Sequence, residues 1–255
     1  MDETTGFLES GAARLAWRRV AGREPLILWL GGFRSNMAGT KAVSLAEWAG
    51  GKGRAFLRFD YFGHGASDGR FETGTITRWR GDTLAVIDRL TRGPLVLVGS
   101  SMGAWLACLA SLARPDRIKA LVLIAPAADF TEKLLSPGLP REARAAIERD
   151  GAWLHPPAHG EEGYLISRAL LEDGARWSIL PGPAGVEAPV RILHGGADPD
   201  VPWSHGLDLA KALTTKDLVF TLVRDGDHRL SRPQDLERLI ANIEEVSATA
   251  WPPEP

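Results

Sequence analysis

The chain has 255 residues, of which 30 are Lys or Arg and 32 are Asp or Glu, so its formal net charge is −2. A charge so close to zero gives no reason to expect binding to nucleic acid or to an anionic membrane. The single Cys108 excludes an internal disulfide and a multi-cysteine zinc site. The N-terminus lacks the apolar segment of a signal peptide, and no apolar run reaches the roughly 20 residues of a membrane-spanning helix. We therefore expect a cytoplasmic protein.

Short apolar runs alternate with amphipathic stretches, which is typical of strands and helices around a mostly parallel sheet. An antiparallel edge hairpin of residues 7–8 and 13–20 is expected first. The expected core strands have the continuous apolar character of strands buried on both faces, and cover residues 25–30, 54–59, 95–98, 120–124, 190–193 and 218–223. The expected helices cover residues 37–48, 76–90, 104–112, 204–213 and 233–246.

The alternation is interrupted between residues 127 and 189, in a segment rich in Pro, Gly, Arg and Glu. Two helical pieces are expected there, at 141–149 and 163–172. The pattern favours one α/β domain over residues 1–255 with a small helical cap inserted above the carboxyl edge of the sheet. An ordinary decorated loop is the alternative, because long insertions add little loop-closure cost.

The segment 99–103, Gly-Ser-Ser-Met-Gly, lies between an expected strand and an expected helix. This is the context of a G-x-S-x-G nucleophile elbow, in which two glycines allow a strained turn that exposes the central serine. In this register Ser101 is the nucleophile and Ser100 is a spacer.

A serine hydroxyl needs a base that takes its proton and a group that orients the base. His228 is the best candidate base, because it follows the last expected strand and so emerges at the same sheet edge as the elbow. The acid is expected after the preceding strand; we favour Asp198, since Asp200 directly precedes a helix that it can cap. A metal site of His194, Asp198 and Asp200 is an alternative that the elbow serine leaves unneeded, and no metal or cofactor is expected.

The charge that develops on a carbonyl oxygen in acyl transfer needs hydrogen-bond donors already in place. The backbone N–H of Met102, directly after the nucleophile, supplies one donor at the start of a helix. We assign the second donor to the backbone N–H of Phe33, in the glycine-rich loop after the strand at 25–30, with Gly32 as its rival. The Phe33 ring is also expected to line the pocket.

Two further sets of residues have other interpretations. His64 lies in the glycine-rich loop 60–67 and precedes the nucleophile in the sequence, so we interpret it as architectural rather than as the base. Four tryptophans could line an apolar acyl pocket or pack in the core and cap, namely Trp105, Trp153, Trp177 and Trp203.

The chain resembles the serine α/β-hydrolase superfamily in motifs that span most of its length. These are the oxyanion strand-loop at 30–33, the D-x-x-G-x-G-x-S loop at 60–67, the elbow at 99–103, the acid loop at 194–202 and the histidine loop at 226–228. A closer resemblance, to the abhydrolase-domain-containing type-10 group, rests on the stretches 151–154, 167–174, 197–203 and 225–231. That group comprises mitochondrial acyl-glucuronide esterases and palmitoyl-protein thioesterases, so the resemblance implies hydrolysis of acyl esters or thioesters.

We therefore expect a serine hydrolase that cleaves carboxylic esters or thioesters of small to medium acyl groups through an acyl-enzyme. Its partner is expected to be a small-molecule substrate, with no nucleic acid or membrane, and the enzyme to be a monomer or a weak homodimer. Peptidase activity is a lesser alternative, and two others stay open. A serine-dependent carbon–carbon hydrolase of ring-cleavage products uses the same triad, and a non-catalytic ligand-binding protein can keep the same fold.

Overall fold

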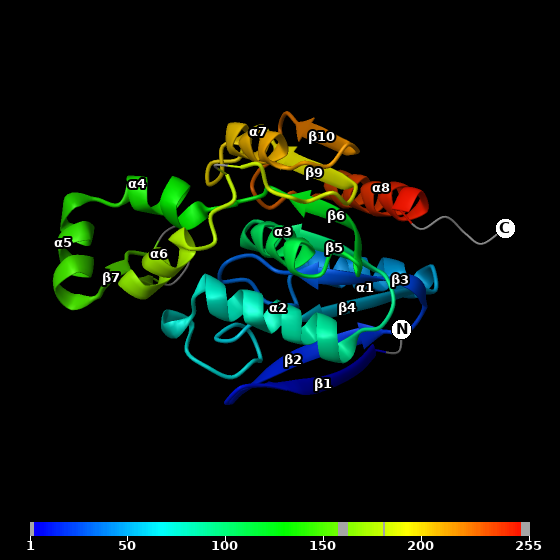
Figure 1. The fold of residues 1–255 in the computed structure, drawn as a ribbon, viewed down its shortest axis with the longest axis horizontal. Coiled ribbons are helices and arrows are strands. Elements are labelled where there is room, and N and C mark those ends of the chain that lie inside the picture. Colours follow the sequence, from blue (N-terminus) through cyan, green and yellow to red (C-terminus); the bar gives the residue numbers. More distant parts are fainter. Residues whose placement is uncertain (1–2, 158–162, 181, 251–255) are drawn as a thin grey trace.

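The computed structural model describes residues 3–157, 163–180 and 182–250, and its centre is an eight-stranded sheet (Figure 1). The strand order is β1-β2-β4-β3-β5-β6-β9-β10; β2 pairs antiparallel with both β1 and β4, and the other neighbouring strands pair in parallel. The strands are β1 (Glu3–Ser10), β2 (Ala13–Val20), β3 (Arg23–Leu30), β4 (Arg54–Phe59), β5 (Leu95–Ser100), β6 (Ile118–Ile124), β9 (Val190–Gly195) and β10 (Leu218–Val223). The expected parallel sheet and its antiparallel N-terminal hairpin are confirmed.

Helices cover both faces of this sheet. One face carries α2 (Ile76–Leu90), α3 (Met102–Ala113) and α7 (Trp203–Ala212), and the other carries α1 (Thr40–Gly51) and α8 (Pro233–Ala250). In β3, alternate side chains enter the two cores, because successive residues of a strand point to opposite faces. Each fully buried leucine or isoleucine stabilises the fold by roughly 1.5–3 kcal/mol. No helix of the described ranges is long and apolar enough to cross a membrane.

Between β6 and β9 the chain leaves the sheet, and Figure 1 shows this segment on the left, beyond one end of the strands. Its elements are the π-helix η2 (Thr131–Leu135), α4 (Ser136–Gly138), α5 (Arg141–Asp150), β7 (Ala152–His155), β8 (Tyr164–Ser167) and α6 (Arg168–Ala175). Four buried residues give it a small core of its own, namely Leu139, Ala143, Ile147 and Ile166. We propose that residues 127–189 act as a cap, and use this name for them below.

The expected helix at 163–172 is wrong in its first half. Tyr164–Ser167 forms β8, which pairs antiparallel with β7, and the helix begins only at Arg168. The Ser167 hydroxyl accepts a hydrogen bond from the N–H of Leu170 at 3.1 Å, which marks the start of α6. The strand forms because β7 offers an extended partner, a pairing that the segment's own sequence does not reveal.

Two buried carboxylates hold the cap in place, one by a contact with the rest of the molecule and one by contacts within the cap. Asp173 of α6 accepts hydrogen bonds from the N–H and the hydroxyl of Thr77, both at 2.6 Å, in the first turn of α2. A negative charge at a helix N-terminus is stabilising. Asp129, at the start of the cap, accepts the Ser178 hydroxyl at 2.5 Å and the N–H groups of Ile179 and Leu180 at 3.0 Å. Asp129 therefore joins the entry of the cap to its exit.

Candidate active site

Ser101 lies in a sharp turn between β5 and α3. Its φ of 56° and ψ of −118° form a strained backbone conformation. A Cβ atom at Gly103 would lie 2.1 Å from the carbonyl oxygen of Leu30, and one at Gly99 would lie 2.4 Å from that of Gly103. Both positions therefore require glycine, and the turn has the geometry that the elbow motif needs.

The imidazole of His228 meets the carboxylate of Asp198. The Nδ1–H group of His228 donates to Oδ2 of Asp198 at 2.8 Å, and the Asp198 side chain has no exposed surface. The other oxygen, Oδ1, accepts the backbone N–H groups of Asp200 and Val201, each at 2.9 Å. Burial alone would raise the pKa of Asp198, but the hydrogen bonds from His228 and the backbone outweigh it and hold the pKa below its usual value. The structure thus pairs His228 with Asp198, while the side chain of Asp200 is exposed.

Ser101 and His228 line the same cavity, whose volume is about 1000 Å³. Within the described residues no hydrogen bond joins the two side chains. Because Nδ1–H of His228 is donated to Asp198, its Nε2 atom carries the lone pair that a general base needs. Hydrogen bonds between a nucleophile and its base are often loose in ligand-free enzymes and tighten when the substrate binds.

The loop that carries Phe33 lies directly against the elbow. A Cβ atom at Gly32 would lie 3.3 Å from Cβ of Ser101 and 3.3 Å from the carbonyl oxygen of Ser100. Phe33 and Met102 both line the cavity together with Ser101, and Met102 begins α3. The two residues that the sequence offers as oxyanion donors are therefore neighbours of Ser101.

Several residues of the cavity wall escape the sequence analysis. An apolar part comes from the cap, and a basic part comes from the loops and helix near the nucleophile. These residues are Phe130, Leu134, Leu135 and Tyr164 in the cap, and Arg34, Lys41 and Arg229 outside it. Arg34 and Arg229 directly follow residues that the motifs single out, which is the one signal that could have found them.

Lys41 of α1 is joined to the histidine loop, since its Nζ group donates to the carbonyl oxygen of Arg229, the residue after His228. Burial lowers the pKa of Lys41 to about 8, against the opposing influence of Asp227. The histidine loop is thus held by a basic side chain of α1 that also lines the cavity.

The tryptophans considered for the acyl pocket are not among the described residues that line this cavity, so that alternative is wrong. Trp105 is fully buried, and its Nε1–H donates to the carbonyl oxygen of Trp177 at 3.2 Å. Trp177 in turn donates to the Thr77 hydroxyl at 2.7 Å, so both rings connect the cap to the core. Trp153 packs against the cap core and Trp203 is 42% exposed.

The arrangement favours an acid–base pair over a metal site. The ligand atoms of Asp198, Asp200 and His228 lie within 4.8 Å of one another. However, Oδ2 of Asp198 already accepts a hydrogen bond from Nδ1–H of His228. His194, the third ligand considered from the sequence, instead directs its Nε2–H to the carbonyl oxygen of Val201 at 3.0 Å. The hydrogen bonds thus serve to orient an imidazole rather than to surround a cation.

His64 is buried and is not among the described residues that line the cavity. Its Nδ1–H donates to the carbonyl oxygen of Phe62 at 3.1 Å, and its Nε2 accepts the N–H of Arg34 at 3.3 Å. Burial lowers the pKa of His64 from 6.5 to about 4, which keeps the ring neutral and able to accept that hydrogen bond. These contacts support an architectural role.

The low pKa of His64 predicts a loss of stability in mild acid. Between pH 6.5 and about 4 the unfolded chain binds a proton that the folded chain excludes, so the free energy of unfolding falls as the pH falls through this window. A shift of this size corresponds to about 3 kcal/mol. Urea unfolding at pH 7, 5.5 and 4.5 checks it, with His64→Gln as the non-titrating control that still offers Arg34 an acceptor. Equal pH slopes in both proteins would contradict the assignment.

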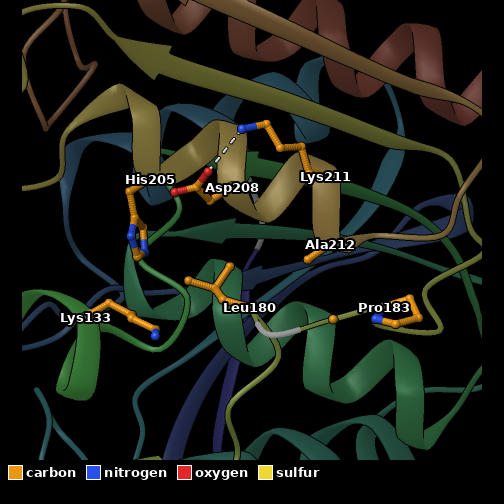
Figure 2. A pocket seen from close by; sticks show the side chains of 8 residues that line it. Lys133, Leu180, Pro183, His205, Asp208, Lys211 and Ala212 are labelled. Carbon is orange, nitrogen blue, oxygen red and sulfur yellow. Dashed lines mark hydrogen bonds and ion pairs between the residues drawn. The ribbon is translucent and has the colours of Figure 1, made fainter.

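A second cavity, of about 680 Å³, lies between α7 and the exit of the cap (Figure 2). Its walls carry both charges, and Asp208 and Lys211 of α7 form an ion pair at 3.3 Å, which is the dashed line in Figure 2. His205 projects from the same helix and donates Nε2–H to the carbonyl oxygen of Ala128 at 2.7 Å. Ser101 and His228 are not among the described residues that line this cavity, so it is separate from the candidate active site.

Known proteins resemble this chain in sequence. The family described as Hydrolase_4, serine aminopeptidase S33, matches residues 26–168. The palmitoyl-protein thioesterase ABHD10 of Mus musculus, mitochondrial by its name, is 39% identical over 233 residues. The match covers 91% of this chain and 78% of the mouse protein.

Solved structures also resemble it over nearly the whole length. A putative hydrolase from Agrobacterium vitis S4 has a TM-score of 0.90 and 41% identity, with 96% of this chain and 98% of that chain covered. The mouse alpha/beta hydrolase domain-containing protein 10 has a TM-score of 0.88 and 37% identity, with coverages of 96% and 99%. At 96% coverage, both matches must include most of residues 127–189.

Proposed function

The chain belongs to the α/β-hydrolase family, together with the ABHD10 proteins, and we propose that it is a serine hydrolase of carboxylic esters or thioesters. The observation that carries this proposal is the Asp198–His228 hydrogen bond at 2.8 Å beside a strained elbow serine in one cavity. A base oriented by a buried carboxylate next to a serine hydroxyl is the arrangement of nucleophilic acyl transfer.

In the first half of the reaction, Nε2 of His228 takes the proton of the Ser101 hydroxyl as Oγ attacks the acyl carbonyl carbon. Asp198 keeps the imidazole in the required tautomer and stabilises the imidazolium. The N–H groups of Phe33 and Met102 hold the oxyanion, and the α3 N-terminus adds its positive dipole end. When the tetrahedral intermediate collapses, the bond to the leaving group breaks and His228 gives its proton to the alcohol or thiol.

In the second half, His228 takes a proton from water, and the resulting hydroxide attacks the acyl-enzyme. The same two N–H groups hold the second oxyanion, and collapse returns the proton to Ser101 and releases the acid. The apolar wall of Phe33, Phe130 and Leu135 offers a surface for the acyl chain. This wall, with the printed name of the mouse relative, supports acyl esters and thioesters as the substrate class.

A substrate panel tests the proposed function. We expect p-nitrophenyl esters of increasing acyl length and S-acyl peptides to be hydrolysed. The highest kcat/KM is expected for an ester or a thioester and not for either of the comparison substrates. A ring-cleavage product and an aminoacyl-anilide serve as comparison substrates. Turnover of the ring-cleavage product alone would favour carbon–carbon hydrolysis, and turnover of the anilide alone would favour a peptidase. A protein that binds the esters without turning any of them over would be a ligand-binding member of the fold.

The oligomeric state, the binding partners and the cellular location of the protein stay predictions. We propose a monomer or weak homodimer that acts in the cytoplasm on a small-molecule substrate, without nucleic acid or membrane. The near-zero net charge supports the absence of a nucleic-acid partner. The name of the mouse relative places that protein in mitochondria, so localisation of this chain needs its own measurement.

A further inference from the structure

Two side chains of the cap, Tyr164 and Phe130, contact the oxyanion loop at residues 33–34, and Tyr164 contacts both of these residues. The guanidinium carbon of Arg34 lies 4.5 Å from the ring centroid of Tyr164 in β8, which is the geometry of a cation–π contact. The rings of Tyr164 and Phe33 also meet edge to face, with centroids 5.7 Å apart. Tyr164 also stacks on His155 of β7, with ring centroids 4.8 Å apart and an interplanar angle of 14°. The cap hairpin therefore places the Tyr164 ring, stacked on His155, against residues 33–34.

The backbone of this loop is strained where Tyr164 contacts it. Arg34 has a φ of 59°, which a side-chain-bearing residue adopts only when its surroundings enforce it. On the core side, the N–H of Arg34 donates to Nε2 of His64 at 3.3 Å. On the cap side, the guanidinium is covered by the Tyr164 ring. The loop is thus held between the core and the cap.

The ring of Phe33 is held in the same way. Its centroid lies 4.9 Å from Phe71 and 5.9 Å from Trp79, which belong to the core side. It lies 5.3 Å from Phe130, which belongs to the cap, as Tyr164 does. Residues of the core and of the cap therefore both contact the side chain of the residue whose N–H we assign to the oxyanion hole.

We propose that Tyr164 is a positioning residue that couples the seating of the cap to the alignment of the Phe33 N–H group with the oxyanion. The inference rests on the proposed function, because it requires Phe33 as an oxyanion donor. A positioning role for Tyr164 differs from a role in the pocket wall in which substrates it affects. A wall residue affects only acyl chains long enough to reach it, whereas a positioning residue affects turnover of the smallest acyl group as well.

The test compares Tyr164→Leu, which removes the ring, with Tyr164→Phe, which keeps it. For p-nitrophenyl acetate we expect Tyr164→Leu to lower kcat roughly 10-fold with KM changed less than about 2-fold, the size of a partly desolvated cation–π contact. Tyr164→Phe is expected to stay within about 3-fold of the wild type, since the ring face is retained. Arg34→Met removes the cation from the same contact and is expected to resemble Tyr164→Leu.

A second readout follows the oxyanion directly. Butylboronic acid forms a tetrahedral adduct with the active-site serine that places a negative oxygen in the oxyanion hole, so its Ki is expected to rise in Tyr164→Leu by the factor by which kcat/KM falls. Leu154→Ala, at a 59% exposed position of β7, controls for general loosening of the hairpin and is expected to leave both values unchanged. If Tyr164→Leu fails to fold, as judged by its Tm, the same readouts on Arg34→Met decide the matter.

Two outcomes distinguish failure of this inference from failure of the proposed function. If the ring-removing variant raises KM only for long acyl chains and leaves acetate turnover and the boronate Ki unchanged, Tyr164 is a wall residue and the inference is wrong, while the proposed function stands. If the wild-type enzyme neither turns over any ester or thioester nor reacts with a fluorophosphonate, the proposed function fails and the inference falls with it.

Discussion

Replacing Ser101 with alanine is expected to lower kcat for p-nitrophenyl esters by at least about 10⁴-fold, because the acyl-enzyme can no longer form. The structure gives the reason for the size of this effect. Ser101 is the residue with the strained elbow conformation, and it lines the cavity with His228. The residual activity of such a variant is too low to define its KM, so the hydrolysis rates of the variant and the wild type are compared at a saturating concentration of ester.

A fluorophosphonate probe checks the same assignment without turnover. The wild type is expected to be labelled at Ser101, and Ser101→Ala is expected to lose the label completely. Ser100→Ala is the matched control, because Ser100 is the buried spacer at the end of β5 and its loss leaves the nucleophile in place. Labelling that persists in Ser101→Ala and disappears in Ser100→Ala would move the elbow by one residue.

Asp198→Asn is expected to lower kcat by roughly 10³- to 10⁴-fold with little change in KM. Asparagine fits the space, but its amide can present N–H groups toward His228 and so stabilise the tautomer whose Nε2 carries a proton. That imidazole cannot accept the proton of Ser101. The measurement is kcat and KM for one ester across the pH range in which the protein is folded.

Asp200→Asn is the comparison that makes this prediction sharp. Asp200 lies two residues away and gives Asp198 its backbone N–H, which the substitution keeps. We therefore expect a far smaller loss for Asp200→Asn than for Asp198→Asn. Equal losses would mean that the pair formed by His228 and Asp198 does not carry the catalytic role proposed for it.

The candidate site could be found from the sequence because its parts are local motifs attached to strand ends. The glycines on either side of Ser101 report a turn that only a few backbone conformations can make. Asp198 and His228 each follow a strand of a parallel sheet, and such strands bring their carboxyl ends to one edge. Chain order and strand order therefore sufficed to predict that His228 and Asp198 meet, as they do at 2.8 Å.

The cap could not be predicted to the same depth, because its contacts join residues far apart in the chain. Tyr164–Ser167 is a strand only because Ala152–His155 pairs with it, and the amphipathic sequence around it fits a helix equally well. Likewise, nothing local marks Asp173 as the partner of Thr77, 96 positions away. Tertiary packing decided these pairings.

By itself, then, the sequence determined the parallel sheet, the strained serine turn and the loops that carry Asp198 and His228. Each of these depends on backbone sterics or on the order of strands, which short segments encode. The tertiary structure alone decided which aromatic rings line the pocket. It also decided the contact of Tyr164 with the oxyanion loop, where the ring centroid lies 4.5 Å from the guanidinium carbon of Arg34. Packing of this kind depends on all neighbouring surfaces at once, so no single segment specifies it.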